Sequence, residues 1–218
     1  MTSPYAQGPA PTATLIRTGR TMFRQSALGG SGCALVGAAL LVMGILLTAG
    51  IIGDASAAGG IAVTVLGGFL LIMFCFVLRI SWKSRNAFLC VDQVGLWVSG
   101  QAGQKVIPWD TLAGVGLYWS KPMGKGKVKQ HSLELCPSGP IDRDHPVLWN
   151  LVRDEEPLNP SLPRLRYRVP VHRKDQEALV TAVQQYAGHL WLGEAEREPN
   201  HMGFPDVKGH RERTRGQG

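Results

Sequence analysis

The densest group of chemically capable side chains lies at residues 142–145, where Asp142, Arg143, Asp144 and His145 follow one another. Carboxylates and imidazoles are the side chains that bind metal ions and transfer protons. Ligands so close together in sequence rarely converge on one ion unless a rigid element supports them. We therefore interpret this group as a polar turn.

Other catalytic patterns are missing from the sequence. It contains no G-x-S-x-G, G-x-x-x-x-G-K or H-E-x-x-H, so the common hydrolase, nucleotide-binding and zinc-protease fingerprints are absent. The four cysteines (Cys33, Cys75, Cys90 and Cys136) show no C-x-x-C or histidine-rich spacing that indicates zinc. We expect no catalytic residue, no metal site and no cofactor, and we interpret Cys90 and Cys136 as small apolar residues of strands.

One basic segment could act on a charged surface. Four lysines fall within nine residues and have glycines between them: Lys121, Lys125, Lys127 and Lys129. A hairpin loop of this composition is an ordinary solvated connection, but next to a membrane the same charges attract anionic lipid headgroups. We name these lysines as candidate anionic-lipid contacts and keep the plain loop as the alternative.

Two apolar stretches precede these candidate residues in the sequence and predict a membrane-spanning segment. Residues 32–53 and 59–78 contain no Asp, Glu, Lys, Arg or His, and each is long enough as a helix to cross the roughly 30 Å hydrocarbon core of a bilayer. A pair of buried core helices is the alternative. A signal peptide fits poorly, because the first stretch is too long and the second follows at once. We predict a two-helix transmembrane hairpin within residues 29–80.

The flanks of the hairpin predict its orientation. The link between the two stretches, residues 54–58, contains no Lys or Arg. By the positive-inside rule both flanks are cytoplasmic, which places both termini in the cytoplasm and the link outside the plasma membrane. The basic flanking residues are Arg17, Arg20 and Arg24 before the first stretch, and Arg79, Lys83 and Arg85 after the second.

Small residues lie along both predicted helices and let helix backbones approach closely in lipid. We expect them to pack the hairpin against itself, with homo-oligomerisation as the alternative. The absence of Asp, Glu, Lys, Arg and His inside the spans argues against transport through this hairpin alone. The small residues are Gly37, Gly44 and Thr48 in the first stretch, and Gly60, Thr64 and Gly68 in the second.

The formal charge of +7 and the pI of about 9.5 do not indicate nucleic-acid binding. Residues 1–31 and 79–85 each carry +3, so most of the excess is accounted for by the flanks of the hairpin. Residues 86–192 contain 12 basic and 10 acidic residues, and the segment 193–218 contains five of each. We expect membrane lipid as a partner, and no nucleic acid.

After the hairpin the hydrophobic pattern changes to period two, which indicates β-strands. The predicted strands cover 87–91, 94–99, 105–107, 111–120, 131–136 and 166–171. A final helix of about 16 residues follows, because Leu179, Ala182, Val183, Tyr186 and Leu190 form one apolar stripe at helical spacing. We expect a domain at 86–192 with an insert at about 138–165, a flexible tail at 1–28 and a disordered tail at 193–218.

The residues of this domain resemble a known family. The order Val91-Asp92, Gly95-Leu96, then Ile107-Pro108-Trp109-Asp110 and a final helix is similar to bacterial pleckstrin-homology-like (PH-like) domains that follow a two-helix membrane hairpin. The resemblance covers about residues 30–192, and the insert at 138–165 departs from it.

The resemblance implies a cytosolic α+β, mainly β, split barrel capped by the C-terminal helix, with Trp109 and Asp110 in structural positions. It implies binding or scaffolding, and no catalysis. The partners would be membrane lipid and another membrane or cytosolic protein. The alternative function is a structural or accessory subunit that assembles with a membrane complex through its helices.

Overall fold

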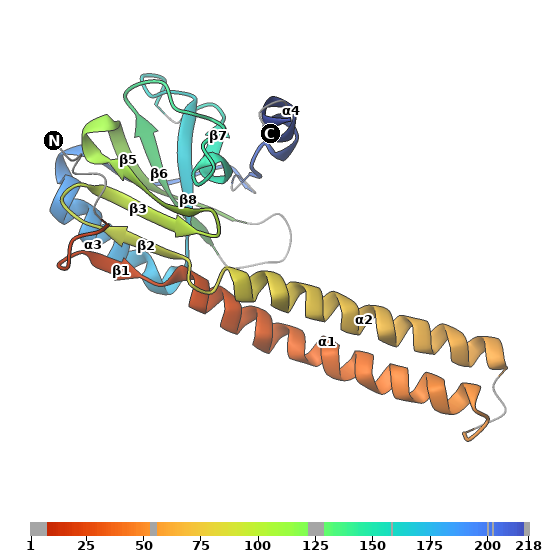
Figure 1. Ribbon diagram of the computed structural model, residues 1–218. Helices are drawn as coiled ribbons and strands as arrows, with labels where there is room; N and C mark the ends of the chain where they lie inside the picture. The colour runs from red at the N-terminus through yellow and green to blue at the C-terminus, as the bar shows by residue number, and fades with distance from the viewer. Residues whose placement is uncertain are drawn as a thin grey trace. The chain divides into compact units, whose positions relative to one another are not determined.

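The computed structural model describes residues 8–52, 56–121, 129–157, 159–199, 201 and 203–215, without the side chains of Thr21 and Met22. The chain forms two compact units, a helical hairpin from Arg17 to Ala87 and a domain built from the residues on both sides of it (Figure 1). The hairpin is thus inserted into the domain sequence, since the segment before Arg17 supplies part of the domain.

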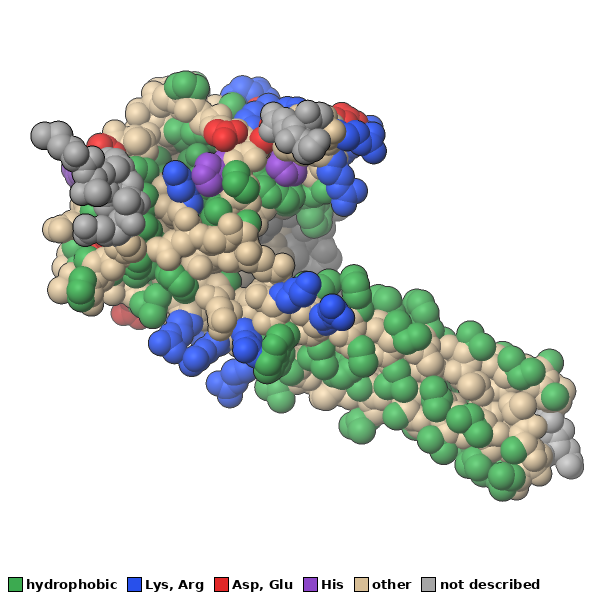
Figure 2. Space-filling view, viewed as in Figure 1, with side chains coloured by type: hydrophobic (Ala, Val, Ile, Leu, Met, Phe, Trp, Pro, Cys, Tyr) green, Lys and Arg blue, Asp and Glu red, His purple; other side chains and the backbone are tan. Residues whose placement is uncertain are grey.

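The hairpin consists of α1 (Thr18–Thr48) and α2 (Ala57–Lys83). Both helices are long and apolar enough to cross a membrane. Only 11% of the most apolar 18-residue segment of α1 is buried, and only 6% of that of α2. Core helices of a soluble protein would be mostly buried, so the low burial argues against that alternative. Hydrophobic side chains cover the exposed surface of both helices (Figure 2).

The helices are longer than the predicted spans. Helix α1 begins at Thr18 rather than near residue 32, and α2 continues to Lys83. The predicted limits followed the apolar composition alone, whereas a helix continues through basic residues until its backbone hydrogen bonds end. The side chain of Ser56 begins α2 by accepting a hydrogen bond from the Gly59 amide at 3.3 Å.

The remaining residues form an α+β domain with two sheets. Sheet A is antiparallel and contains four strands in the order β1 (Thr14–Ile16), β2 (Phe88–Val91), β3 (Gly95–Gly100) and β4 (Gly103–Pro108). Sheet B has the order β7 (Val152–Asp154), β8 (Leu165–Val171), β6 (Gln130–Pro137), β5 (Leu112–Ser120) and β9 (Trp191–Glu196), with β9 parallel to β5.

One core joins both sheets and α3 (Gln176–Ala187). The alternating residues Leu133 and Leu135 of β6 are fully buried in it, as are Leu179 and Val183 of α3. The predicted capping helix thus packs on the sheets. No closed barrel forms among the described residues, so the prediction of a split barrel holds only in its coarser form, as two sheets capped by helices.

Asp92 fixes the turn between β2 and β3. Its Oδ1 atom accepts hydrogen bonds from the amides of Val94 (2.9 Å) and Gly95 (3.1 Å), and its Oδ2 atom accepts one from Trp97 Nε1 at 2.9 Å. The Asp92 carbonyl accepts a further bond from Trp109 Nε1 at 2.8 Å. These bonds explain how a carboxylate that is 2% exposed is accommodated in the domain.

Three elements lie in segments for which the sequence predicts tails. Residues 14–16 form β1 and pair with β2, residues 191–196 form β9, and residues 207–214 form the helix α4 (Val207–Thr214). All three elements are short, with three residues in β1, six in β9 and eight in α4, so none has a strong local pattern. Strand pairing with a distant part of the chain supplies the backbone hydrogen bonds of β1 and β9, whereas α4 is held by side-chain contacts with Asp144 and Trp149.

We predict that Leu179→Ala lowers the free energy of unfolding by about 2–5 kcal/mol, because it leaves a cavity where a fully buried side chain packed. Urea denaturation of the whole protein in detergent, followed by tryptophan fluorescence, measures the change. Gln185→Ala on the exposed face of α3 is the matched control and should stay within about 0.5 kcal/mol of wild type. Equal midpoints for the two variants would contradict the packing of α3 in the core.

Candidate functional site

The small residues of the hairpin lie where the two helices meet. An added Cβ atom at Gly44 would collide with Thr64, and one at Gly60 would collide with Thr48. Both threonines turn their hydroxyls to their own helix, since Thr48 Oγ1 donates to the Gly44 carbonyl (2.7 Å) and Thr64 Oγ1 to the Gly60 carbonyl (2.9 Å). Close backbone approach at these positions therefore depends on small residues.

Two further glycines complete this contact. A Cβ atom at Gly37 would lie 3.2 Å from the Gly67 carbonyl oxygen, and one at Gly67 would lie 2.7 Å from the Gly37 carbonyl oxygen. Gly68 does not approach α1 as closely, because a Cβ atom there would meet only Leu41 at 3.8 Å. The four-residue spacing in the sequence predicts Gly68 at the contact, but the rotation of α2 places Gly67 there instead.

The six basic flanking residues lie at one end of the hairpin, from the residue before α1 to the residues just after α2. The guanidinium of Arg85 lies 3.5 Å from the ring centroid of Trp82, which also meets Phe23 edge to face at 5.4 Å. Tryptophan beside arginine at one end of an apolar helix pair is the arrangement that membrane interfaces favour.

Of the four candidate lysines, Lys125 and Lys127 lie outside the described residues. Lys129 Nζ lies 3.5 Å from the ring centroid of Trp119, and Lys121 Nζ lies 5.5 Å from it. Lys121 also pairs with Glu196 of β9 at 3.2 Å. Both described lysines are thus gathered around one aromatic ring at the end of β5.

A buried ionic cluster covers the face of sheet B opposite the core. Glu134 of β6 is 1% exposed and binds three arginines: Arg166 (2.8 Å), Arg168 (2.9 Å) and Arg197 (3.0 Å). The strand register explains the arrangement, because Glu134 lies directly opposite Arg168 and Arg166 is two residues along the same face. The sequence shows these arginines alternating with apolar residues, but it does not reveal that the polar face is covered.

The segment after β9 covers this cluster. Arg168 Nη1 donates to the His201 carbonyl at 2.7 Å, and Arg168 Nη2 lies 2.7 Å from Glu155 Oε2. Burial lowers the pKa of His201, and the charges of Arg168 and Arg197 lower it further. Gly203 passes so close to Glu155 and Arg168, with φ of 56°, that a side chain would not fit there.

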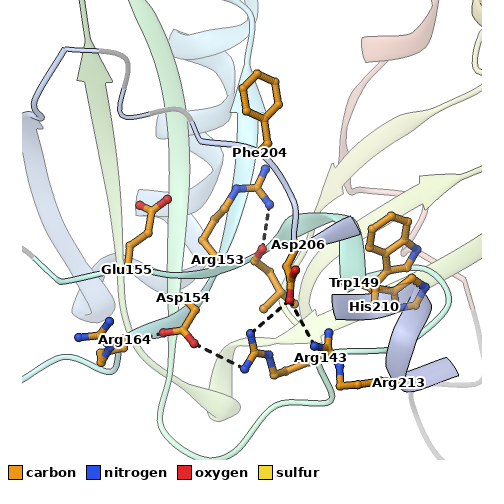
Figure 3. A pocket seen from close by; sticks show the side chains of 11 residues that line it. Arg143, Trp149, Arg153, Asp154, Glu155, Arg164, Phe204, Asp206, His210 and Arg213 are labelled. Atoms are coloured by element: carbon orange, nitrogen blue, oxygen red, sulfur yellow. Dashed lines mark hydrogen bonds and ion pairs between the residues drawn. The ribbon is translucent and has the colours of Figure 1, made fainter. Parts of the chain in front are cut away.

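A pocket of about 380 Å³ opens beside the cluster (Figure 3). Its lining joins the insert, which includes β7, and the C-terminal segment. Arginines and acidic residues make up most of the lining, together with two aromatic rings. The residues are Arg143, Trp149, Val152, Arg153, Asp154, Glu155, Arg164, Phe204, Asp206, His210 and Arg213.

Helix α4 is held to the insert by ionic contacts and one ring stack. The ring of His210 lies parallel to Trp149 with centroids 4.1 Å apart. Asp144 accepts from Arg213 Nε at 2.7 Å and lies 2.7 Å from His210 Nδ1, and these hydrogen bonds lower the pKa of Asp144 to about 2. A depressed carboxyl pKa means that the contact is fully present above about pH 4 and is lost as the pH falls toward 2.

The predicted polar turn at residues 142–145 does not gather a metal site. Asp142 Oδ1 accepts from the Asp144 amide at 2.9 Å and His145 Nδ1 accepts from the Val147 amide at 3.2 Å. Throughout the part of the chain that the structure describes, no group of three His, Cys, Asp or Glu side chains could hold a metal ion. Burial raises the pKa of Cys136 to about 11, which leaves its thiol protonated and unreactive.

Comparison with protein-family models, with curated proteins and with solved structures finds no match to this chain.

Proposed function

We propose that this chain is an integral protein of the plasma membrane that presents a non-catalytic binding or scaffolding domain on the cytoplasmic side. The observation that carries the proposal is the hairpin itself, two long helices whose apolar side chains are exposed along their length. Exposed apolar surface of this extent is stable in a bilayer and costly in water.

The orientation follows from the charges at the ends of the hairpin. The end where α1 begins and α2 finishes carries six basic residues, and Figure 2 shows blue side chains gathered there. The other end has no Lys or Arg between Thr48 and Ala57. By the positive-inside rule the basic end, and with it the domain, lies in the cytoplasm.

The domain supplies the binding function in this proposal. Two sheets capped by α3 are compatible with the PH-like fold that the sequence resembles, and we propose that fold for it. Its two described lysines around Trp119 are suited to anionic lipid, because each basic residue near such a surface contributes about 1 kcal/mol.

Topology is tested by single cysteines in a protein whose native cysteines are replaced. A cysteine at Ala57 should react with a membrane-impermeant reagent added to intact cells, whereas one at Gly100 should react only after lysis. Gly100 suits this purpose because it is exposed and a Cβ atom there meets nothing within 4 Å. Labelling of Gly100→Cys in intact cells would contradict the cytoplasmic placement of the domain.

The lipid contact is tested in nanodiscs that hold the whole protein. Hydrogen exchange at residues 121–129 should be slower in phosphatidylglycerol than in phosphatidylcholine, and raised salt should remove the difference. Changing all four lysines to glutamine should abolish it. The matched control, Lys105→Gln on β4, should retain it. Equal exchange in the two lipids would leave the segment as a plain loop.

A further inference from the structure

The charges of the buried cluster do not balance. Arg153, Arg166, Arg168 and Arg197 are all at least nine-tenths buried, and the acidic groups among them are Glu134 and the half-buried Glu155. Four guanidinium groups face two carboxylates, so the cluster holds two uncompensated positive charges. Removing unpaired charge from water is costly, and such an excess indicates a site for an anion.

Arg153 carries this excess. Its side chain is 7% exposed, and no carboxylate lies within ion-pair distance of it in the described part of the chain. Its Nη1 atom donates to the carbonyls of Asn150 (2.9 Å) and Val152 (2.8 Å), while its Nε atom has no hydrogen-bond partner. Burial lowers the pKa of Arg153, and the nearby charge of Arg168 lowers it further.

The same residue lines the pocket, which makes the unbalanced charge accessible to a ligand. Figure 3 shows Arg153 above Asp206, and Arg143 and Arg213 reach that carboxylate at 3.9 Å and 3.2 Å. The Asp206 carboxylate thus already holds anionic oxygens against two guanidinium groups. Asp206 belongs to the C-terminal segment, and its side chain is half exposed. An anion that carries more negative charge than a carboxylate can therefore displace it.

Among the described residues, no carboxylate at the rim of the pocket lies within ion-pair distance of Arg153. Arg143 and Arg164 share Asp154, Arg164 also pairs with Glu156, and Arg213 pairs with Asp144. With Asp206, which pairs with Arg143 and Arg213, the rim has four carboxylates for three guanidinium groups. Once Asp206 is displaced, the three guanidinium groups and the other three carboxylates balance. The remaining demand for negative charge is that of the buried cluster behind Arg153.

We propose that this pocket binds a phosphate monoester, with Arg153 as the main ligand and Arg143 completing the contact. A phosphate monoester carries close to two negative charges at pH 7, which matches the excess that remains when Asp206 is displaced, and its oxygens accept several donors from guanidinium groups at once. The pocket, at about 380 Å³, has space for the alcohol part as well as for the phosphate. The site belongs to the α+β domain alone, so its test does not depend on whether the helices cross a membrane.

The experiment titrates glycerol phosphate into the whole protein in neutral detergent at constant ionic strength. Isothermal titration calorimetry measures the dissociation constant. A second arm titrates phosphatidic acid in phosphatidylcholine nanodiscs, which separates a lipid headgroup from a soluble ester. Wild type should bind in at least one arm. Arg153→Gln should bind roughly tenfold or more weakly, because it loses hydrogen bonds between two charged groups.

Two further variants keep the result interpretable. Asp206→Asn removes a competing carboxylate but keeps an oxygen that can cap α4, so binding should tighten severalfold. Arg164→Gln is the matched control, since Arg164 lines the same pocket but is exposed and paired, and it should bind within about twofold of wild type. No binding by wild type in either arm, or equal binding by Arg153→Gln, would overturn the proposal. If Arg153→Gln does not fold, unchanged binding by Asp206→Asn would overturn it.

Discussion

The antiparallel pairing of β1 with β2 is the constraint on which the arrangement of this chain depends. Thr14, Leu15 and Ile16 lie opposite Val91, Cys90 and Leu89, so the chain leaves the sheet at Ile16 and returns to the neighbouring strand after the entire hairpin. Closing such a long loop costs conformational entropy. The packed helices offset this cost, because they return the chain to its starting point, where the Gly19 amide donates to the Ala87 carbonyl at 2.9 Å.

The insertion joins the hairpin to two strands that are neighbours in sheet A. The two connections between the hairpin and the sheet are short, and they leave from adjacent strands of one sheet. The isolated segment 86–192 would lack both β1 and most of β9, which leaves the edges of β2 and β5 unpaired.

The parts of the fold that the sequence predicts are those with strong local patterns. The apolar stretches gave the two helices, the alternation of Leu133 and Leu135 gave β6, and the stripe through Leu179 and Val183 gave α3. The short strands β1 and β9 have no such pattern. Their state is determined by the partner strand, which lies far away in the sequence.

The same reasoning applies to the candidate site. Arg166 and Arg168 are visible in the sequence as polar residues between apolar ones, which normally indicates a face in contact with water. Burial of that face depends on Arg197, His201 and Gly203, which lie in a segment whose composition resembles that of a disordered tail. Neither the ionic cluster nor the pocket beside Arg153 could be inferred until that segment was placed.

The most direct measurement of the insertion is a disulfide between Leu15→Cys and the native Cys90, in a protein whose other three cysteines are replaced by alanine. Directly opposed strand residues have Cα atoms about 4.5–5.5 Å apart, which suits a disulfide. After oxidation, a protease site placed in the link between the helices is cut and the fragments are separated without reductant. The account predicts that they stay joined, and that Thr14→Cys, on the other face of the sheet, lets them separate. Separation of the Leu15→Cys fragments would contradict the pairing of β1 with β2.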